Sequence, residues 1–348
     1  SFLMAGIPAS LSKVYEPPEL PENHSVFAVD GSHIDVDRHM AMNCYLINIG
    51  KVYLQYGIDP KALVSSEPFL YSEDRTLQIY DPEGNRSQNI EGPLLGAVRA
   101  VEEMRSLVKL LNETDSELPS LVLIDGSLIL WGIVGQTYPD FVRRQLLDEM
   151  FLPAMQELAD ISNKRPLALA SYISLPRSKD VVNTLRLDPL NCPYDLANCD
   201  THCGSLGHRN RPCDGLSEIL DRDIFNLTLQ DNQRSDHFIT TSSIVERYYG
   251  ENIINFYYLK VGNEIARVEI PKWVCNKPEL LDLTHSILIN QCQKGHGYPV
   301  SIMEAHEQAV VTTSDREEFR IIVEEALQRH NLPNYTSEKN RSKRIRWI

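Results

Sequence analysis

The chain has 348 residues, of which 42% are hydrophobic and 24% are charged, so it can bury a large core in one or two domains. It contains no run of 18 or more apolar residues, which excludes a long apolar membrane-spanning segment. The formal net charge of -14 argues against nucleic-acid binding through a uniformly basic surface, although a local basic groove beside an acidic site remains compatible with it.

The first third of the chain predicts an irregular segment, then strands and a helix. Residues 1–24 are rich in Pro and Glu and are expected to be an irregular lead-in that begins an ordered fragment. The apolar residues 26–29 predict a short strand. Residues 40–58 predict a hairpin that turns at Gly50-Lys51. Apolar positions at helical spacing predict a helix over 94–112.

The middle of the chain alternates strands and helices. Residues 121–124 and 167–173 are fully apolar and predict buried strands, with a helix between them over 141–163. A short helix is expected at 178–187, with Asp180 in its first turn. Residues 189–216 lose all periodicity and are interpreted as an insertion that contains cysteines.

The last third predicts three strands, then a helix, a strand-to-helix passage and a final helix. Their ranges are 237–241, 254–261, 264–270, 278–294, 298–311 and 315–330. Strands that first form a hairpin and then alternate with helices indicate an α/β fold, a mixed sheet with helices on both faces.

Two copies of an apolar strand followed by Asp-Gly-Ser are present, at Asp30 and at Asp125. Either copy alone is more typical of a plain turn. Together they favour a site, because carboxylates at the ends of neighbouring buried strands project into one crevice and provide oxygen ligands suited to Mg²⁺ or Mn²⁺.

A second group of chemistry-bearing residues is expected around a helix start near the end of the chain. Tyr298 precedes Glu304, His306 and Glu307 by a few residues. A single His is more often structural than a ligand, but its clustering with carboxylates and an aromatic hydroxyl favours a site role. Tyr298 could hydrogen-bond a scissile phosphate or simply pack in the core.

Six blocks in order resemble the NurA nuclease family over nearly the whole chain. They cover residues 27–32, 121–127, 171–182, 258–271, 297–308 and 337–348. The resemblance implies an RNase H-like fold, with residues 25–348 forming one nuclease domain. It also implies an enzyme that needs Mn²⁺ or Mg²⁺ and acts on single-stranded DNA and DNA ends, as an endonuclease and a 5′–3′ exonuclease.

The resemblance further implies a homodimer that docks on a HerA-type hexameric ATPase during recombinational repair of double-strand breaks. The family's catalytic and metal-binding Asp residues match Asp30 and Asp125, and the Tyr and His of its last motif match Tyr298 and His306. Asp30, Asp125, a Glu and His306 would hold one or two divalent ions. One ion would lower the pKa of an attacking water, and the other would stabilise the departing 3′ oxygen.

The family also uses a helix carboxylate between the two Asp residues, and this chain offers Glu102 and Glu103. Glu103 is slightly favoured because it shares a helix face with Leu107 and Leu110. Either one could equally well be an exposed Glu that pairs with Arg99, which lies four residues before Glu103.

Several basic residues are candidates for contacts with DNA phosphates, although for each one taken separately an exposed solvated charge is the more typical interpretation: Arg177, Lys179, Arg186, Arg267 and Lys294. Asp35 and Asp37 alternate on a strand and are expected to face solvent rather than bind metal.

Four cysteines in the insertion, Cys192, Cys199, Cys203 and Cys213, have a spacing compatible with a structural Zn²⁺ site. Free or partly oxidised thiols are the main alternative, and an iron–sulfur cluster is another. The remaining three, Cys44, Cys275 and Cys292, are expected in the core. An odd total of seven cysteines favours a reducing cytoplasm.

The basic tail at 337–348 could guide DNA, anchor an ATPase or remain solvated, and its Arg-Trp-Ile end suggests packing against the body near the acidic site. Two other functions remain open. One is a phosphodiesterase that acts on RNA or another nucleic acid with the same fold, and the other is a non-catalytic scaffold that guides DNA to an ATPase.

Overall fold

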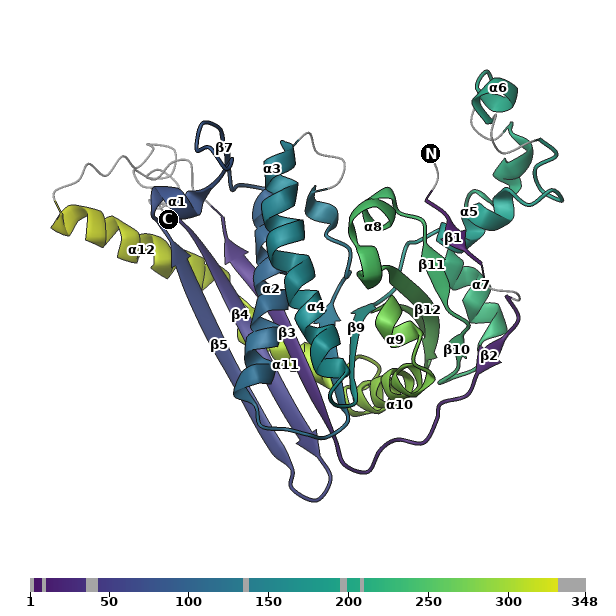
Figure 1. Ribbon diagram of the computed structural model, residues 1–348, viewed down its shortest axis with the longest axis horizontal. Coiled ribbons are helices and arrows are strands. Elements are labelled where there is room, and N and C mark those ends of the chain that lie inside the picture. Colours follow the sequence, from purple (N-terminus) through teal and green to yellow (C-terminus); the bar gives the residue numbers. More distant parts are fainter. Residues whose placement is uncertain are drawn as a thin grey trace, which may run out of the picture.

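The computed structural model describes residues 3–7, 11–35, 43–133, 138–194, 199–206 and 210–330. One mixed sheet runs through it (Figure 1). The strand order is β1 (Ala5–Gly6), β11 (Phe238–Thr240), β12 (Ile254–Val261), β13 (Glu264–Pro271), β9 (Leu167–Ile173), β8 (Ser120–Asp125), β3 (His24–Ile34), β4 (Tyr45–Tyr56) and β5 (Lys61–Tyr71). The two-residue strands β2 (Val14–Tyr15) and β10 (Arg234–Ser235) pair beside β12.

The five strands that matter for function are β5, β4, β3, β8 and β9. The first three form an antiparallel meander, whereas β8 pairs in parallel with both β3 and β9. The expected α/β fold, a mixed sheet flanked by helices, is confirmed. Because β3, β8 and β9 run the same way, their carboxyl ends lie at one edge of the sheet.

Helices cover both faces of this sheet because side chains alternate along the central strands. Phe27 and Val29 pack with α2 (Pro93–Glu113) and with the helical segment over 140–162. That segment consists of α3 (Asp140–Arg143), a π-helical stretch η2 (Arg144–Phe151) and α4 (Leu152–Ser162). Val26 and Ala28 pack on the other face with α10 (Pro278–Lys294) and α11 (Val300–Ala309).

The remaining elements lie around this core. They are α1 (Asp74–Leu77), the hairpin β6 (Gln78–Tyr80) and β7 (Ser87–Asn89), η1 (Trp131–Ile133), α5 (Asp180–Arg186), α6 (Cys199–Cys203), η4 (Pro212–Leu216), α7 (Asp221–Thr228), α8 (Ser243–Tyr248), η5 (Gly250–Asn252), α9 (Lys272–Cys275) and α12 (Thr313–Arg329). The insertion with α6 and the projecting helix α12 lie at opposite ends of the molecule (Figure 1). Within the described ranges, none of the helices combines the length and apolar character that crossing a membrane requires.

Most predicted elements of the core are confirmed, including α2, β8, β9, α5, α10 and the final helix. The predicted turn at Gly50-Lys51 is wrong, because both residues lie inside β4, which continues to Tyr56 before the chain turns. Lys51 is buried there and pairs with Glu67 on β5. The chain then returns as strand β5 at the edge of the sheet, which the sequence did not predict.

Two other expectations need correction. The passage at 298–311 contains helix α11 but no strand. The lead-in is not wholly irregular, because β1 and β2 add two-residue strands to the sheet. The predicted basic tail at 337–348 and Asp37 lie outside the described residues.

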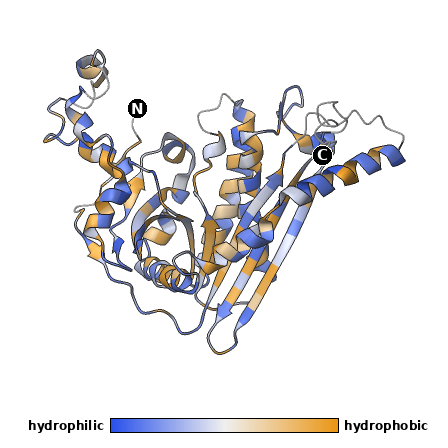
Figure 2. Cartoon of the chain, turned by 180° about the vertical axis from the view of Figure 1, so that it is seen from behind, coloured by the Kyte–Doolittle hydropathy of each residue, from blue (hydrophilic) through white to orange (hydrophobic). Residues whose placement is uncertain are grey.

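Hydrophobic residues are frequent in the sheet and in the helices packed on it, as the colouring of the ribbon in Figure 2 shows from behind. Cys292 is part of this core and Cys275 packs against it, whereas Cys44 lies in a smaller cluster with Val323 and Leu327 of α12. The expectation that these three cysteines are core residues is confirmed.

His285 of α10 makes folding stability depend on pH. Its side chain is fully buried, and Nε2 lies 2.8 Å from the carbonyl oxygen of Asn232. Burial lowers the pKa of His285 from 6.5 to about 4; the Asn232 contact and Glu16 oppose this, while Arg234 adds to it. Because the folded pKa lies below the unfolded one, this contribution to stability is present above pH 6.5 and is lost as the pH falls toward 4.

We therefore expect the free energy of unfolding to fall by about 2–3 kcal/mol between pH 7 and pH 4.5 through His285 alone. Urea unfolding of the wild type and of His285→Gln at both pH values measures this, since other acidic groups cancel in the difference. If the two proteins lose stability in parallel, His285 is not the responsible group.

Candidate active site

Asp30 and Asp125 lie side by side at the carboxyl edge of the sheet. Residue Val29 of β3 pairs with Ile124 of β8, so each Asp is the next residue on two adjacent parallel strands. Strand β8 ends at Asp125, and Gly126 turns the chain away with a φ of 86°. The expectation of a turn at the other Asp is wrong, since β3 continues through Asp30 to Ile34 while paired with β4.

The two carboxylates affect each other. The Asp125 side chain reaches solvent, but partial burial of its carboxyl still raises its pKa, and the negative charge of Asp30 raises it further. The hydroxyl of Tyr298 and the backbone N–H of Gly126 oppose this by stabilising the charged form. Two carboxylates held this close favour a cation between them.

Glu103 of α2 is the third carboxylate, and the structure distinguishes it from Glu102. Glu103 is only 6% exposed, and its pKa is raised to about 8 by burial, with Asp30 and Asp125 adding to the shift and Arg99 opposing it. Glu102 instead pairs with Arg105 on another side of the helix. Only Glu103 therefore lies with the two Asp residues.

Gly31 allows this helix to approach the strand. A Cβ at Gly31 would lie 2.5 Å from Glu103 Oε1 and 3.0 Å from Arg99 Cγ. Arg99 uses the space to donate from Nη1 to the Gly31 carbonyl oxygen at 2.8 Å, and its Nε lies 3.3 Å from Glu103 Oε1. That Glu103 oxygen is buried and completes no hydrogen bond with the described part of the chain.

Tyr298 and His306 each hold one of the Asp carboxylates. Nδ1 of His306 lies 2.7 Å from Asp30 Oδ2, and the Tyr298 hydroxyl donates to Asp125 Oδ1 at 2.9 Å. The Tyr298 ring packs edge-on against Tyr172 of β9. Burial and the neighbouring Asp125 raise the pKa of Tyr298, so its hydroxyl keeps its proton and remains a donor.

Helix α11, which carries His306, is fixed against β3 and β4 by close backbone contact. A Cβ at Gly50 would lie 2.0 Å from the Ala305 carbonyl oxygen and 2.6 Å from the Ala309 nitrogen. The Asn48 amide donates to the carbonyl oxygens of Gln308 and Ala309. Gly50 is thus the contact at which the sheet sets the position of His306.

We expect Gly50→Ala to displace α11 and to lower any activity of this site by about 10²-fold, the typical loss when a catalytic group is misplaced by an ångström. Activity and thermal unfolding should be measured together, to show that the variant still folds. The matched control is Gly96→Ala in α2, where a Cβ meets nothing within 4 Å. Equal activity in the two variants would refute a positioning role for Gly50.

The five predicted phosphate contacts differ in their surroundings. Arg177 and Lys294 are exposed, and Lys179 Nζ donates to the Ser217 carbonyl oxygen at 2.5 Å. In contrast, Arg186 and Arg267 are buried and paired with buried carboxylates. Sequence could not show this depth, and the structure places these two arginines out of reach of a DNA phosphate.

The cysteine segment does not support the zinc hypothesis. Cys192, Cys203 and Cys213 are buried, Cys199 is partly buried, and none of them is in a disulfide. Burial raises the pKa of the Cys203 thiol, with smaller contributions from the other three, so the four lie in one neighbourhood. Across the described ranges, however, no group of three or more His, Cys, Asp or Glu side chains is arranged to hold a metal ion.

Within the described ranges, the side chains of the carboxylate site are likewise not arranged around a metal ion, and their contacts explain this. Asp30, Asp125 and Glu103 are each turned toward a partner of their own, His306, Tyr298 and Arg99. The spacing of four in the sequence suggested Arg99 as an ion-pair partner of a helix Glu, and the structure shows that pair with Glu103. The contacts that Asn48 and Gly50 make with α11 were not predicted.

Comparison with known proteins gives one strong match. A family model for the NurA domain matches residues 24–311, well over half of the chain. A crystal structure of NurA with manganese is similar with a TM-score of 0.44 and 10% identity, covering 90% of this chain and 91% of that one. A type 1 RNase H with the type 2 active-site motif gives a TM-score of 0.24 and 8% identity, covering 49% and 72%. No curated protein matches the chain significantly.

Proposed function

The chain belongs to the NurA domain family, a family of nucleases, and from that premise we propose that it is a metal-dependent nuclease that hydrolyses phosphodiester bonds in DNA. The observation that carries the proposal is the convergence of Asp30, Asp125 and Glu103 from β3, β8 and α2 at one edge of the sheet. Three carboxylates this close are unfavourable unless a cation offsets their charge.

The residues present fit a divalent ion. Asp30, Asp125 and Glu103 provide carboxylate oxygens, the ligands that Mn²⁺ and Mg²⁺ prefer. The buried Oε1 of Glu103 has an ion pair with Arg99 but no hydrogen bond within the described residues, and the pKa of this residue is still raised, which indicates a negative charge that Arg99 compensates only in part. When bound, a divalent ion would supply an activated water and would stabilise the departing oxygen.

The chain's own groups prepare that site. His306 holds Asp30 in place and can bind or release a proton, while Tyr298 holds Asp125 through its hydroxyl. Arg99 joins the strand to the helix and places positive charge beside Glu103. The exposed Arg177 and Lys294 are proposed to contact the DNA backbone through their positive charge.

We further propose, as the family resemblance implies, that residues 25–348 form one nuclease domain. This domain would work as a homodimer with a HerA-type ATPase and trim DNA ends for recombinational repair. Exposed apolar side chains are available for such contacts, namely Leu63 and Leu70 on the two faces of the edge strand β5, and Ile321 and Ile322 on α12.

Cleavage assays with matched substrates test the proposal. The purified chain is incubated with Mn²⁺ and with labelled single-stranded DNA, double-stranded DNA or RNA of the same sequence. We expect DNA to be cut, and EDTA to lower the rate by at least about 10²-fold, since the ion activates the water. Faster cleavage of RNA, or an undiminished rate in EDTA, would contradict it.

A further inference from the structure

A cavity of about 260 Å³ lies near the carboxyl edge of the sheet, outside the carboxylate site, and is not used by the proposed chemistry. Its lining includes Ser127 from the loop after β8 and Ile173 from the end of β9. Asp125 pairs with Tyr172, so Ile173 is one residue further along the same carboxyl edge. Ile173 pairs with Arg267 of β13, and both side chains point to the face of the sheet opposite Asp125, which shares the face of Tyr172. The cavity therefore opens at the same carboxyl edge as Asp125, one strand further along the sheet and on the other face.

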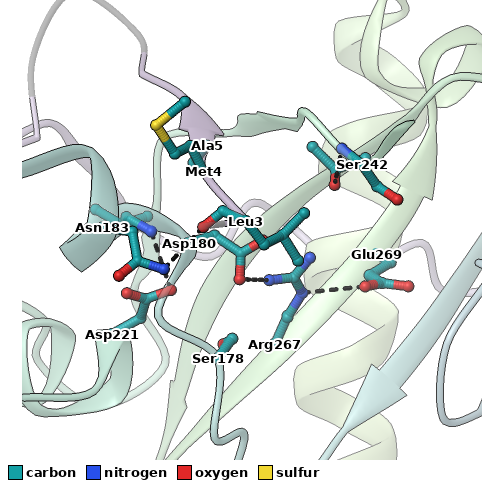
Figure 3. Close-up of polar contacts among 12 residues, drawn as sticks. Leu3, Met4, Ala5, Ser178, Asp180, Asn183, Asp221, Ser242, Arg267 and Glu269 are labelled. Carbon is teal, nitrogen blue, oxygen red and sulfur yellow. Dashed lines mark hydrogen bonds and ion pairs between the residues drawn. The ribbon is translucent and has the colours of Figure 1, made fainter. Parts of the chain in front are cut away.

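The floor of the cavity is a buried charge network, shown in Figure 3. Arg267 lies between Asp180 and Glu269, with Nη1 3.1 Å from Asp180 Oδ2 and Nε 3.0 Å from Glu269 Oε1. Glu269 Oε2 accepts from the Ser127 hydroxyl at 2.7 Å and from the Leu128 N–H at 2.9 Å. Glu269 is thus saturated and fixes the loop after β8.

Asp180, unlike Glu269, has one carboxylate oxygen without a hydrogen bond in the described part of the chain. It is only 3% exposed, and its Oδ1 has no hydrogen-bond partner within the described ranges. A buried acceptor without a donor is costly, and it indicates that a donor is supplied from outside the chain. The side chain lines the cavity, so that donor would belong to a molecule bound there.

The wall and the rim provide an aromatic surface and positive charge. Trp131 is 39% exposed, and its indole N–H donates to the Ser127 hydroxyl at 3.1 Å. Arg177 is exposed at the cavity, and Lys179 also lines it. With Arg267, these cations outnumber the two carboxylates of the lining, so a phosphate-bearing ligand is not repelled.

These features match one kind of ligand. The volume is below the roughly 300–1,000 Å³ of pockets for drug-sized molecules, and it suits a single nucleobase. Any of the four bases can stack on an aromatic ring, because each has a π-face. A carboxylate acceptor takes an amino group such as cytosine N4, whereas thymine offers only a ring N–H between two carbonyl oxygens.

We propose that this cavity receives one unstacked base of the DNA strand held at Asp125, with Trp131 stacking on it, Arg177 near its phosphate and Asp180 accepting from its amino group. Bases with an amino group are therefore bound better than thymine. This inference rests on the proposed nuclease function and adds a base preference to it.

Binding without cleavage tests the inference. The full chain in EDTA at pH 8 is titrated with fluorescein-labelled ten-residue oligo(dC) or oligo(dT), and affinity is measured by fluorescence polarisation. We expect oligo(dC) to bind about three- to tenfold more tightly. Trp131→Ala should weaken both by about tenfold and Trp131→Phe should restore most of the loss. Tyr80→Ala, an exposed aromatic on β6, is the matched control and should bind as the wild type does.

Asp180→Asn should remove the preference for oligo(dC), and the Trp131 variants remain decisive if that protein does not fold. Equal affinity of the wild type for both oligomers, or no effect of Trp131→Ala, would overturn the inference. Displacement by free dCMP at the concentration where oligo(dC) binds would make the cavity a mononucleotide site and overturn the strand assignment. Biased binding without cleavage in Mn²⁺ would refute the nuclease proposal alone, whereas cleavage with unbiased binding would refute the cavity alone.

Discussion

Asp30→Asn and Asp125→Asn are each expected to lower the rate of Mn²⁺-dependent DNA cleavage by about 10³-fold or more. Each change keeps the shape of the side chain and its contact with His306 or Tyr298, but removes one negative charge from the group that would hold the ion. A loss of about 4 kcal/mol in transition-state stabilisation corresponds to that factor. Single-turnover cleavage of a labelled single strand measures the rate.

Glu103→Gln and Glu102→Gln form a matched pair for the third carboxylate. We expect Glu103→Gln to lose activity like the Asp variants while its thermal stability does not fall, because burial and the two Asp residues disfavour its charged form more than Arg99 favours it. Glu102→Gln should cleave at the wild-type rate, since this residue pairs with Arg105 outside the site. Equal activity of the two variants would refute the assignment of Glu103.

Arg267→Met is expected to destabilise the fold by about 3–5 kcal/mol, the largest effect on stability that we predict. It leaves Asp180 and Glu269 buried without their shared cation, and it removes the guanidinium that lies 3.7 Å from the centre of the Phe256 ring. Urea unfolding at pH 7 measures the change.

The control for this prediction is Arg177→Met, since an exposed cation should change stability by less than about 0.5 kcal/mol. If Arg267→Met folds with nearly full stability and instead loses affinity for DNA, Arg267 is the phosphate contact that its sequence position first suggested.

The sequence was most informative where burial imposes a period. The spacing of Val101, Met104 and Val108 predicts α2, and the unbroken apolar runs predict β8 and β9, because each of these elements is buried against the core. Strand β5 was missed for the opposite reason: its side chains are mostly exposed, so no period marks it.

Local sequence patterns wrongly indicated turns at two glycines that lie inside strands. Gly50 looks like a hairpin turn, but it is required because helix α11 packs directly on β4. Gly31 looks like part of a turn, but it leaves room for Glu103 and Arg99 while β3 continues. In both cases glycine is needed for close approach of another element, which a short sequence window cannot distinguish from a turn.

For the candidate site, sequence could propose the residue types but not their depth. The helix pattern favours Glu103 over Glu102 only slightly, and their burial and partners separate them clearly. The sequence suggested Arg267 as a phosphate contact, but the structure pairs its guanidinium with the carboxylates of Asp180 and Glu269. Long-range pairs such as His306 with Asp30 depend on the strand order, which no local pattern encodes.

The most direct test of the central claim is anomalous diffraction from a crystal soaked in Mn²⁺. We expect an ion within about 2.1 Å of carboxylate oxygens of Asp30, Asp125 and Glu103. His306 or Tyr298 would be displaced as the carboxylates turn toward the ion. A Mn²⁺ ion bound elsewhere, with these three carboxylates still turned toward His306, Tyr298 and Arg99, would contradict it.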